Sequence, residues 1–143
     1  MSHVCASTCC CTNLRRSASI VSDFYDASLK DAGLTIAQYY LLINLSKLGS
    51  ANITHWAERV GLDRSTMVRN IKLLQSRNLV NLTEGHGKVF TLSPEGRKVL
   101  EQAIPLWEKA QEQIRGVLGE EDTEAIFRIS GKLQELNRRG ALG

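Results

Sequence analysis

Apolar residues recur at helical spacing over most of this 143-residue chain. Steps of three and four predict a first helix over residues 12–32 and a second over residues 35–48, which is apolar on nearly every side. A short third helix is expected to follow Thr54 and to close at Gly61, and a fourth to begin at Asp63. The turn between the last two has the length found in a helix-turn-helix.

The hydrophobic period changes after the fourth helix. Residues 79–82 and 88–92 have the composition of short strands around a glycine-rich turn over residues 83–87, a pattern that predicts a β-hairpin. A helix-turn-helix followed by a hairpin is a winged helix.

Two further helices are expected after the hairpin. Ser93 and Pro94 suit a helix start, and the long helix that follows should run to about Leu118 with a kink at Pro105. A last helix over residues 122–138 opens on an acidic turn, as the helix macrodipole favours. The predicted fold class is therefore mainly α (α+β), with a winged helix-turn-helix at its centre.

Composition and charge indicate a folded globular protein with a basic middle. Hydrophobic residues make up 43% of the chain and charged residues 23%. No apolar run approaches the roughly 20 residues that span a bilayer, and no secretory signal is visible, so we expect a cytoplasmic protein without a membrane partner. Residues 52–93 carry a net charge of +3, whereas the flanking segments are nearly neutral. Such a centre suits nucleic acid, although a solvated basic face is an equally common interpretation.

Four motifs, in their order and spacing, resemble the MarR family of bacterial transcriptional regulators. They are Gly33–Tyr39, Ala57–Thr66, Arg77–Val80 and Leu92–Gly96. The resemblance covers residues 12–138 and implies a homodimeric regulator that acts as a repressor. Each subunit would present one winged helix to half of a pseudo-palindromic operator in double-stranded DNA.

The resemblance also implies that the first and last helices interleave in a dimerisation arm. The chain would then divide into a cysteine-rich segment (1–11), a dimerisation helix (12–34), a DNA-binding winged helix (35–93) and a C-terminal pair of helices (94–143). Apolar stripes on the arm helices supply the expected interface, because a chain of this size cannot cover them by itself. The residues expected at this interface are Leu14, Val21, Leu106, Trp107, Ile129, Leu133 and Leu136.

The fourth helix turns a polar, net-basic face away from its apolar stripe. Hydroxyl and guanidinium groups donate to phosphates and base edges, and Arg69 is the best candidate for a bidentate contact with guanine. Family members typically carry Asp-x-Arg at the wing tip, where this chain has Glu84-Gly85-His86, so His86 or Lys88 would contact phosphate more weakly. The expected DNA-binding residues are Arg64, Ser65, Thr66, Arg69, Asn70, Lys72, His86 and Lys88.

The four cysteines crowd into the first eleven residues, at Cys5, Cys9, Cys10 and Cys11. They enclose no long loop and therefore form no disulfide scaffold. Three interpretations stay open: the thiols sense oxidants, they bind a soft metal ion, or they have no sensory role. A small-molecule effector is a further possibility for a regulator of this family.

The redox interpretation rests on a resemblance to the organic-hydroperoxide-resistance repressors of the family. Cys11 aligns with their reactive cysteine, and Tyr25 with one of the two tyrosines that face it; the second tyrosine position is Ile36 here. Cys9 and Cys10 would serve as resolving thiols.

No sequence pattern indicates catalysis. The chain has no Ser/His/Asp order, no glycine-rich phosphate loop and no His-x-x-x-His, so we expect neither an enzyme nor a cofactor. Trp56 and Phe90 are expected in the core. A winged helix used for protein–protein assembly is the alternative from another class, and the basic face of the fourth helix disfavours it.

Overall fold

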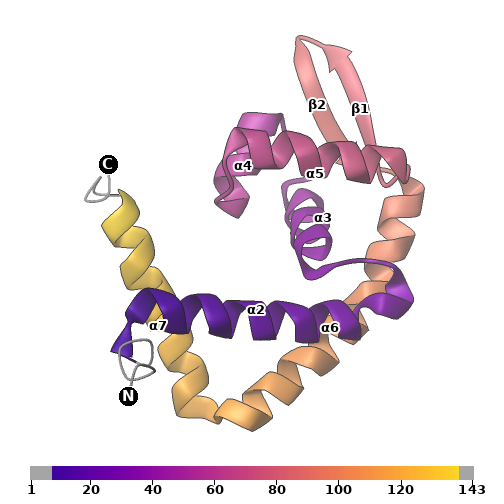
Figure 1. The fold of residues 1–143 in the computed structure, drawn as a ribbon. Coiled ribbons are helices and arrows are strands. Elements are labelled where there is room, and N and C mark those ends of the chain that lie inside the picture. The colour runs from indigo at the N-terminus through magenta and orange to yellow at the C-terminus, as the bar shows by residue number, and fades with distance from the viewer. Residues whose placement is uncertain (1–7, 139–143) are drawn as a thin grey trace. The chain divides into compact units, whose positions relative to one another are not determined.

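A computed structural model describes residues 8–138, which fall into two compact units divided between Trp107 and Glu108. The predicted fold class is confirmed: the chain is mostly helical with one small antiparallel sheet. In chain order, the elements are α2 (Cys10–Ser28), η1 (Lys30–Ala32), α3 (Ile36–Leu48), α4 (Ile53–Val60), α5 (Arg64–Ser76), β1 (Val80–Gly85), β2 (Gly87–Leu92), α6 (Pro94–Leu118) and α7 (Glu120–Arg138) (Figure 1).

The first unit is built around α3, which is apolar on nearly every side as its sequence predicts. Leu41, Leu42 and Leu45 are at most 1% exposed. The fully buried Trp56 of α4 donates from its indole nitrogen to the Leu41 carbonyl at 3.1 Å, so its polar group has a partner inside the core. Its ring lies 5.8 Å from that of Phe90, which confirms both aromatic residues as core.

Side-chain caps set where the helices of the winged helix begin. Thr35 and Gln38 form a reciprocal capping box at the start of α3. The prediction that α4 follows Thr54 is wrong, because Asn52 accepts from the His55 amide and starts the helix at Ile53. An Asn side chain caps a helix as well as a Thr side chain does, so the helix begins after Asn52, the earlier of the two candidate caps.

The hairpin is tighter than the sequence predicts. Its register pairs Val80 with Leu92 and Gly85 with Gly87, which leaves only His86 at the tip instead of a turn over residues 83–87. Ala51 joins the other edge of β2 through two backbone hydrogen bonds with Phe90. The hairpin is therefore anchored to the helices near its base, while its tip extends beyond α5 (Figure 1).

The junction between α5, the hairpin and α6 is a closed set of hydrogen bonds around Ser93, which is 3% exposed. Its hydroxyl donates to the Asn78 carbonyl at 2.6 Å and accepts from the Gly96 amide at 2.9 Å, so it caps α6 as predicted. Its own amide donates to the Leu79 carbonyl at 3.1 Å.

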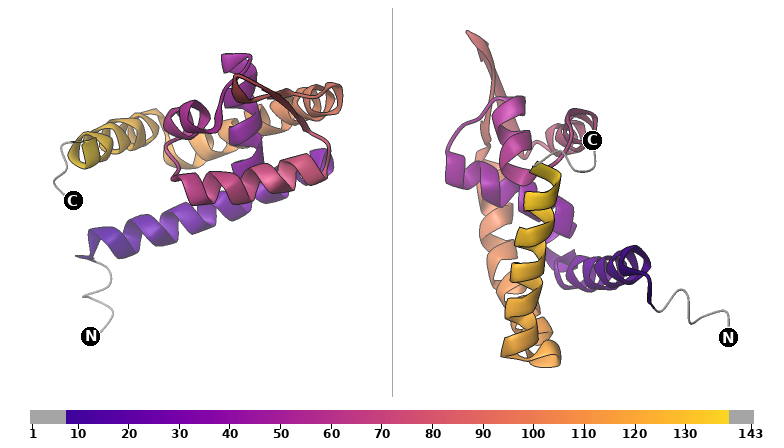
Figure 2. Two further views of the ribbon diagram at one scale, coloured as in Figure 1. Left: turned by 90° about the horizontal axis from the view of Figure 1, so that it is seen from above. Right: turned by 90° about the vertical axis from the view of Figure 1, so that its left-hand side faces the viewer.

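Helix α2 begins at Cys10, two residues before the predicted start, and ends at Ser28 before the short turn η1. Only its carboxyl-terminal part joins the core, through Tyr25 and the following Leu29. Its amino-terminal half projects away from the rest of the unit (Figure 2) and leaves Leu14 48% exposed.

The second unit contains the end of α6 and the whole of α7. Helix α7 starts at Glu120, two residues earlier than predicted. The Arg115 guanidinium lies 2.7 Å from the Glu120 carboxylate and 5.8 Å from the centre of the Phe127 ring, which ties the two helices at their junction. Large apolar side chains on α7 are nevertheless 40–50% exposed: Ile126, Phe127, Ile129, Leu133 and Leu136.

Candidate nucleic-acid interface

The start of α5 is held by Asp63, whose carboxylate caps the helix. The Thr66 amide and the Ser65 hydroxyl both donate to Oδ1 of Asp63, each at 2.8 Å. These donors, together with the nearby Arg69 guanidinium, lower the pKa of the Asp63 carboxyl from its usual value. The carboxylate is therefore ionised at neutral pH and acts only as a hydrogen-bond acceptor.

Helix α5 has one buried and one exposed side. Met67, Ile71 and Leu74 are at most 3% exposed, as the predicted apolar stripe requires. Of the predicted DNA-binding residues on this helix, four are exposed and two are half-buried. The exposed residues are Arg64, Ser65, Arg69 and Lys72; the half-buried residues are Thr66 and Asn70, whose amide donates to the Thr66 carbonyl at 2.8 Å.

Leu73 belongs to the exposed side of α5 as well, at 50% exposure. An apolar residue at helical spacing suggests burial, so the pattern does not indicate Leu73 as a surface residue. Its position, seven residues after Thr66 and four after Arg69, would have placed it on the polar face.

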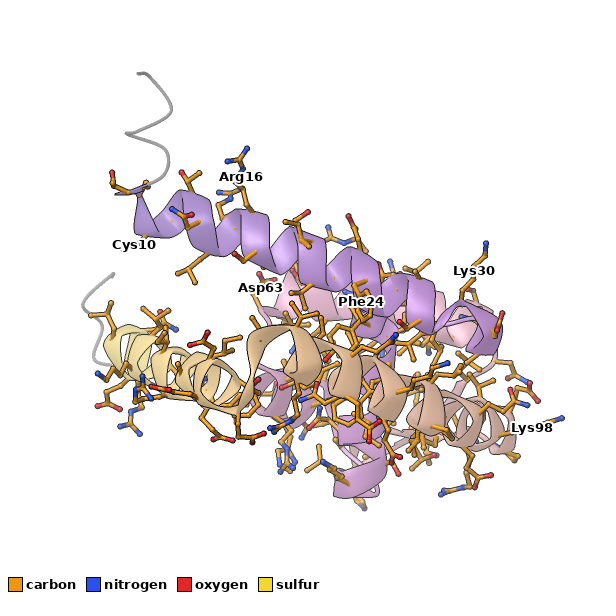
Figure 3. All side chains as sticks on the ribbon, turned by 90° about the horizontal axis from the view of Figure 1, so that it is seen from below. Cys10, Arg16, Phe24, Lys30, Asp63 and Lys98 are labelled. Atoms are coloured by element: carbon orange, nitrogen blue, oxygen red, sulfur yellow. The ribbon has the colours of Figure 1, made fainter. Side chains whose placement is uncertain are left out.

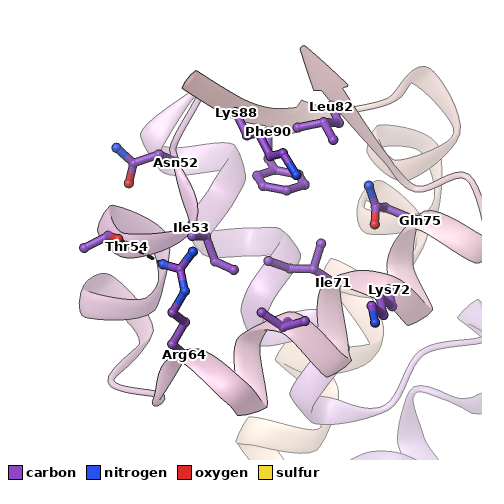
Figure 4. Close-up of a pocket in the computed structure, with 11 residues that line it drawn as sticks. Asn52, Ile53, Thr54, Arg64, Ile71, Lys72, Gln75, Leu82, Lys88 and Phe90 are labelled. Carbon is purple, nitrogen blue, oxygen red and sulfur yellow. Dashed lines mark hydrogen bonds between the residues drawn. The ribbon is translucent and has the colours of Figure 1, made fainter. Parts of the chain in front are cut away.

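A cavity of about 420 Å³ lies between α5, the start of α4 and the hairpin (Figure 4). Arg64, Lys72 and Lys88 contribute cationic side chains to its lining, and Ile71 and Phe90 belong to its apolar part. Arg64 also turns back toward α4, where its guanidinium lies 3.4 Å from the Thr54 hydroxyl. The tertiary fold thus brings cationic side chains of α5 and of the hairpin to the same place.

The wing contributes a single lysine, which has an acidic cross-strand neighbour. His86 is exposed at the tip, and the cross-strand partner of Lys88 is Glu84. Lys88 lines the cavity, so its charge adds to that of α5.

The cysteines within the described residues lie at the outer end of α2. Cys9, Cys10 and Cys11 are all exposed, and Cys10 is labelled at that end in Figure 3. Cys9 occupies the position before the helix, where the Thr12 hydroxyl and then the Thr12 backbone amide lower the pKa of its thiol. The resemblance to the organic-hydroperoxide-resistance repressors instead predicts Cys11 as the reactive thiol.

Tyr25 does not approach these thiols within one chain. It lies fourteen positions after Cys11 on the same helix, which corresponds to about 21 Å along the axis, and its side chain is buried. A contact between Tyr25 and the thiol would therefore have to come from another subunit. Among residues 8–138, no group of three or more His, Cys, Asp or Glu side chains is placed to hold a metal ion; Cys5 lies outside the described residues.

The residues predicted for dimerisation differ in how far one chain covers them. Leu106 and Trp107 pack against the core of the first unit, and the Trp107 ring stacks on Tyr39 with 6.0 Å between centroids. Val21 is half-buried. The exposed members are Leu14 on α2 and Ile129, Leu133 and Leu136 on α7.

In the described part of the chain, every helix is too short or too polar to cross a membrane.

The winged helix is matched by proteins that regulate transcription. The chain is 28% identical to the M. tuberculosis transcriptional regulator MosR in complex with DNA, with a TM-score of 0.79 over 91% of this chain and 98% of that one. A MarR family transcriptional regulator from Streptomyces coelicolor is 25% identical, with a TM-score of 0.77 over 90% of this chain and 92% of its own.

A likeness over a shorter stretch links part of the chain to an enzyme subunit. The phenylalanine–tRNA ligase alpha subunit of Thermococcus onnurineus (strain NA1) is 30% identical over 74 residues, or 52% of this chain. The chain spans 15% of the length of that subunit and 20% of its counterpart from Methanopyrus kandleri, so the likeness is confined to a small part of each.

The helix-turn-helix region also matches a protein family model. The family model described as MarR family matches residues 34–85, which run from the start of α3 to the end of β1 and contain every predicted contact on α5. The two regulators above share the fold described here. Over residues 34–85 this chain is similar to the MarR family, and its fold is that of the MarR family transcriptional regulator from Streptomyces coelicolor.

Proposed function

We propose that this protein is a homodimeric transcriptional repressor that binds a pseudo-palindromic operator through α5 and the wing. The observation that carries the proposal is the exposed basic face of α5, held in place by the buried stripe on its other side. A polar helix face of this kind suits the major groove, where arginine and hydroxyl groups contact base edges and phosphates. In this proposal the protein is not an enzyme. It acts on DNA in the cytoplasm.

The two parts of the interface have different tasks in this proposal. Ser65, Thr66, Arg69 and Asn70 face the bases, whereas cations around the cavity neutralise the phosphate backbone. The cations are Arg64, Lys72 and Lys88, with His86 adding a weaker contact from the wing tip.

The test of operator binding is a selection of genomic fragments by the full-length protein. We expect an enriched inverted repeat whose half-site centres lie about one helical turn, roughly 10–10.5 base pairs, apart, because dimer geometry fixes that spacing. Selection that enriches no palindrome would contradict the proposal.

The homodimer rests on apolar surface that the single chain leaves open. Ile129, Leu133 and Leu136 recur along one side of α7 and are 40–45% exposed, and Leu14 is similarly exposed on α2. Contiguous apolar surface of this kind marks an interface, and a second copy supplies the same helices in return. Sedimentation at micromolar concentration should show a dimer, and Leu133→Glu should weaken it; a stable, cooperatively folding wild-type monomer would contradict the proposal.

Redox control is proposed at the cysteines around the start of α2, which are Cys9, Cys10 and Cys11. A cysteine thiolate attacks a hydroperoxide, which breaks the O–O bond and releases an alcohol once the leaving oxygen takes a proton; the cysteine becomes a sulfenic acid. A second thiol then condenses with it, so that an S–S bond forms and water leaves. Cys11 is the proposed reactive residue, with Cys9 and Cys10 as resolving thiols, and the bulk and polarity added at α2 would alter the spacing of the recognition helices in the dimer.

The lowered pKa of the Cys9 thiol makes Cys9 a second candidate for the attacking group, because a larger thiolate fraction favours attack. Operator binding by the wild type, Cys11→Ser and Cys9→Ser should therefore be titrated with cumene hydroperoxide and with hydrogen peroxide. Zinc and copper(I) serve as parallel arms for the metal alternative. Equal insensitivity of all three proteins to oxidant would contradict redox control.

A further inference from the structure

The hydroxyl proton of Ser65 is already engaged in a hydrogen bond to Asp63. Ser65 is the second residue of α5 and is exposed, and its Oγ donates to Oδ1 of Asp63 at 2.8 Å. An ionised carboxylate has no proton to offer, so the direction of this hydrogen bond is fixed. What Ser65 presents outward is therefore an oxygen with free lone pairs.

The carboxylate that accepts this hydrogen bond is itself firmly placed. Oδ1 of Asp63 also accepts from the Thr66 amide at 2.8 Å, which makes Asp63 the cap of the same helix. Donation by several groups favours the charged carboxylate and lowers the pKa of Asp63. The arrangement is part of the helix start, and it exists before any DNA is bound.

An acceptor on this helix has few possible partners in DNA. Phosphate oxygens, guanine O6 and N7, adenine N7 and thymine O4 are all acceptors and would meet the lone pairs of Ser65 unfavourably. The donors in the major groove are the exocyclic amino groups, N4 of cytosine and N6 of adenine. Arg69, four residues further along α5, is the opposite case, because a guanidinium has donors only.

We propose that Ser65 is a specificity-determining residue of α5, which accepts a hydrogen bond from the amino group of one adenine or cytosine in each half-site, and that Asp63 is the positioning residue that makes it an acceptor. This inference rests on the proposed function, in which α5 enters the major groove of an operator. It assigns Ser65 to a base pair and excludes a phosphate contact for its hydroxyl.

The experiment uses the full-length protein and the operator found by fragment selection. Each adenine of one half-site is replaced in turn by purine, which lacks the N6 amino group, and each cytosine by 2-pyrimidinone, which lacks the N4 amino group. The two series distinguish the two possible bases. At one position, loss of the amino group should weaken wild-type binding about threefold to tenfold, the range of a single net hydrogen bond.

Variant proteins separate this contact from changes in the duplex itself. Ser65→Ala should bind the natural and the substituted operator equally at that position, because no acceptor is left. In Asp63→Ala the acceptor of the Ser65 hydroxyl proton is absent, so the hydroxyl can donate elsewhere and the preference for the amino group should fall below about twofold. Arg69→Ala is the matched control on the same helix: it should bind more weakly but retain the preference at the Ser65 position.

Two results would overturn this inference and leave the proposed function intact. One is an equal loss in the wild type and Ser65→Ala at every substituted position. The other is a loss in Ser65→Ala that is uniform across sequences and reduces the salt dependence of binding, since that behaviour marks a phosphate contact. A selection that enriches no sequence would overturn the proposed function together with this inference.

Discussion

Replacement of Gly96 by alanine should break the junction between the hairpin and α6. Gly96 lies in the first turn of α6 against the backbone of Leu79. A Cβ atom at this position would overlap the Leu79 carbonyl oxygen, and it would stand only 2.9 Å from the carbonyl carbon and 3.3 Å from Cα. The obstacle is backbone, which cannot rotate aside as a flexible side chain would, so α6 and the chain at Leu79 must move apart.

The expected loss of stability follows from that displacement. Overpacking of a close-packed site costs about 1–3 kcal/mol. Two hydrogen bonds share the junction, from the Ser93 amide to Leu79 and from the Ser93 hydroxyl to Asn78, and each is worth about 0.5–1.5 kcal/mol. The free energy of unfolding should therefore fall by about 2–6 kcal/mol, and the melting temperature by roughly 5–20 °C.

Thermal and urea unfolding followed by circular dichroism measures this change. Gly116→Ala is the matched control, because Gly116 belongs to the same helix and an added Cβ meets no atom within 4 Å. This control should be neutral or gain up to about 1 kcal/mol from helix propensity. All proteins should be compared at one protomer concentration, since dimerisation contributes to stability. A Gly96→Ala protein that unfolds at the wild-type midpoint would show that the junction accommodates the added Cβ atom without cost.

Three further predictions concern binding, pH and oxidation. Arg69→Ala should cost about 1–3 kcal/mol at the base pair that Arg69 contacts and relax specificity there, as measured by competition with operator variants; a loss equal on all sequences would show a phosphate contact instead. Because the pKa of Asp63 is lowered in the folded protein, its cap should stabilise the fold above the usual carboxyl pKa near 3.8 and cease to do so as the pH falls through the folded value. Urea midpoints should consequently decline less steeply with acidification in Asp63→Asn than in the wild type, and a steeper decline would contradict this. Cys11→Ser should retain operator binding in cumene hydroperoxide under conditions that release the wild type, and release of both proteins alike would remove Cys11 as the sensor.

Much of the fold follows from sequence because the interactions involved are local. The caps at Thr35, Asp63 and Ser93 each bond a backbone amide three residues later, so a short segment of sequence contains both partners. The apolar stripe of α5 likewise depends only on helical periodicity. The same reasoning placed Trp56 and Phe90 in the core, although it missed the earlier cap of α4 at Asn52.

The residue types of the candidate site follow from the sequence, whereas their arrangement in space follows from the tertiary structure. The basic face of α5 could be derived by winding the helix, but the cavity that unites Arg64 and Lys72 with Lys88 depends on how the hairpin packs. The acceptor role proposed for Ser65 also required the structure, because sequence does not show that its hydroxyl lies 2.8 Å from the Asp63 carboxylate.

Long-range partners were decided by tertiary structure alone. The Arg77 guanidinium donates to the Gly33 carbonyl at 2.6 Å across 44 residues, and Asp26 accepts from the Ile36 amide at 2.7 Å. The close approach of Gly96 to Leu79 belongs to the same class. A pattern of spacing describes one segment and its own periodicity, whereas these contacts depend on the packing of two segments whose separation in sequence carries no information about their distance in space.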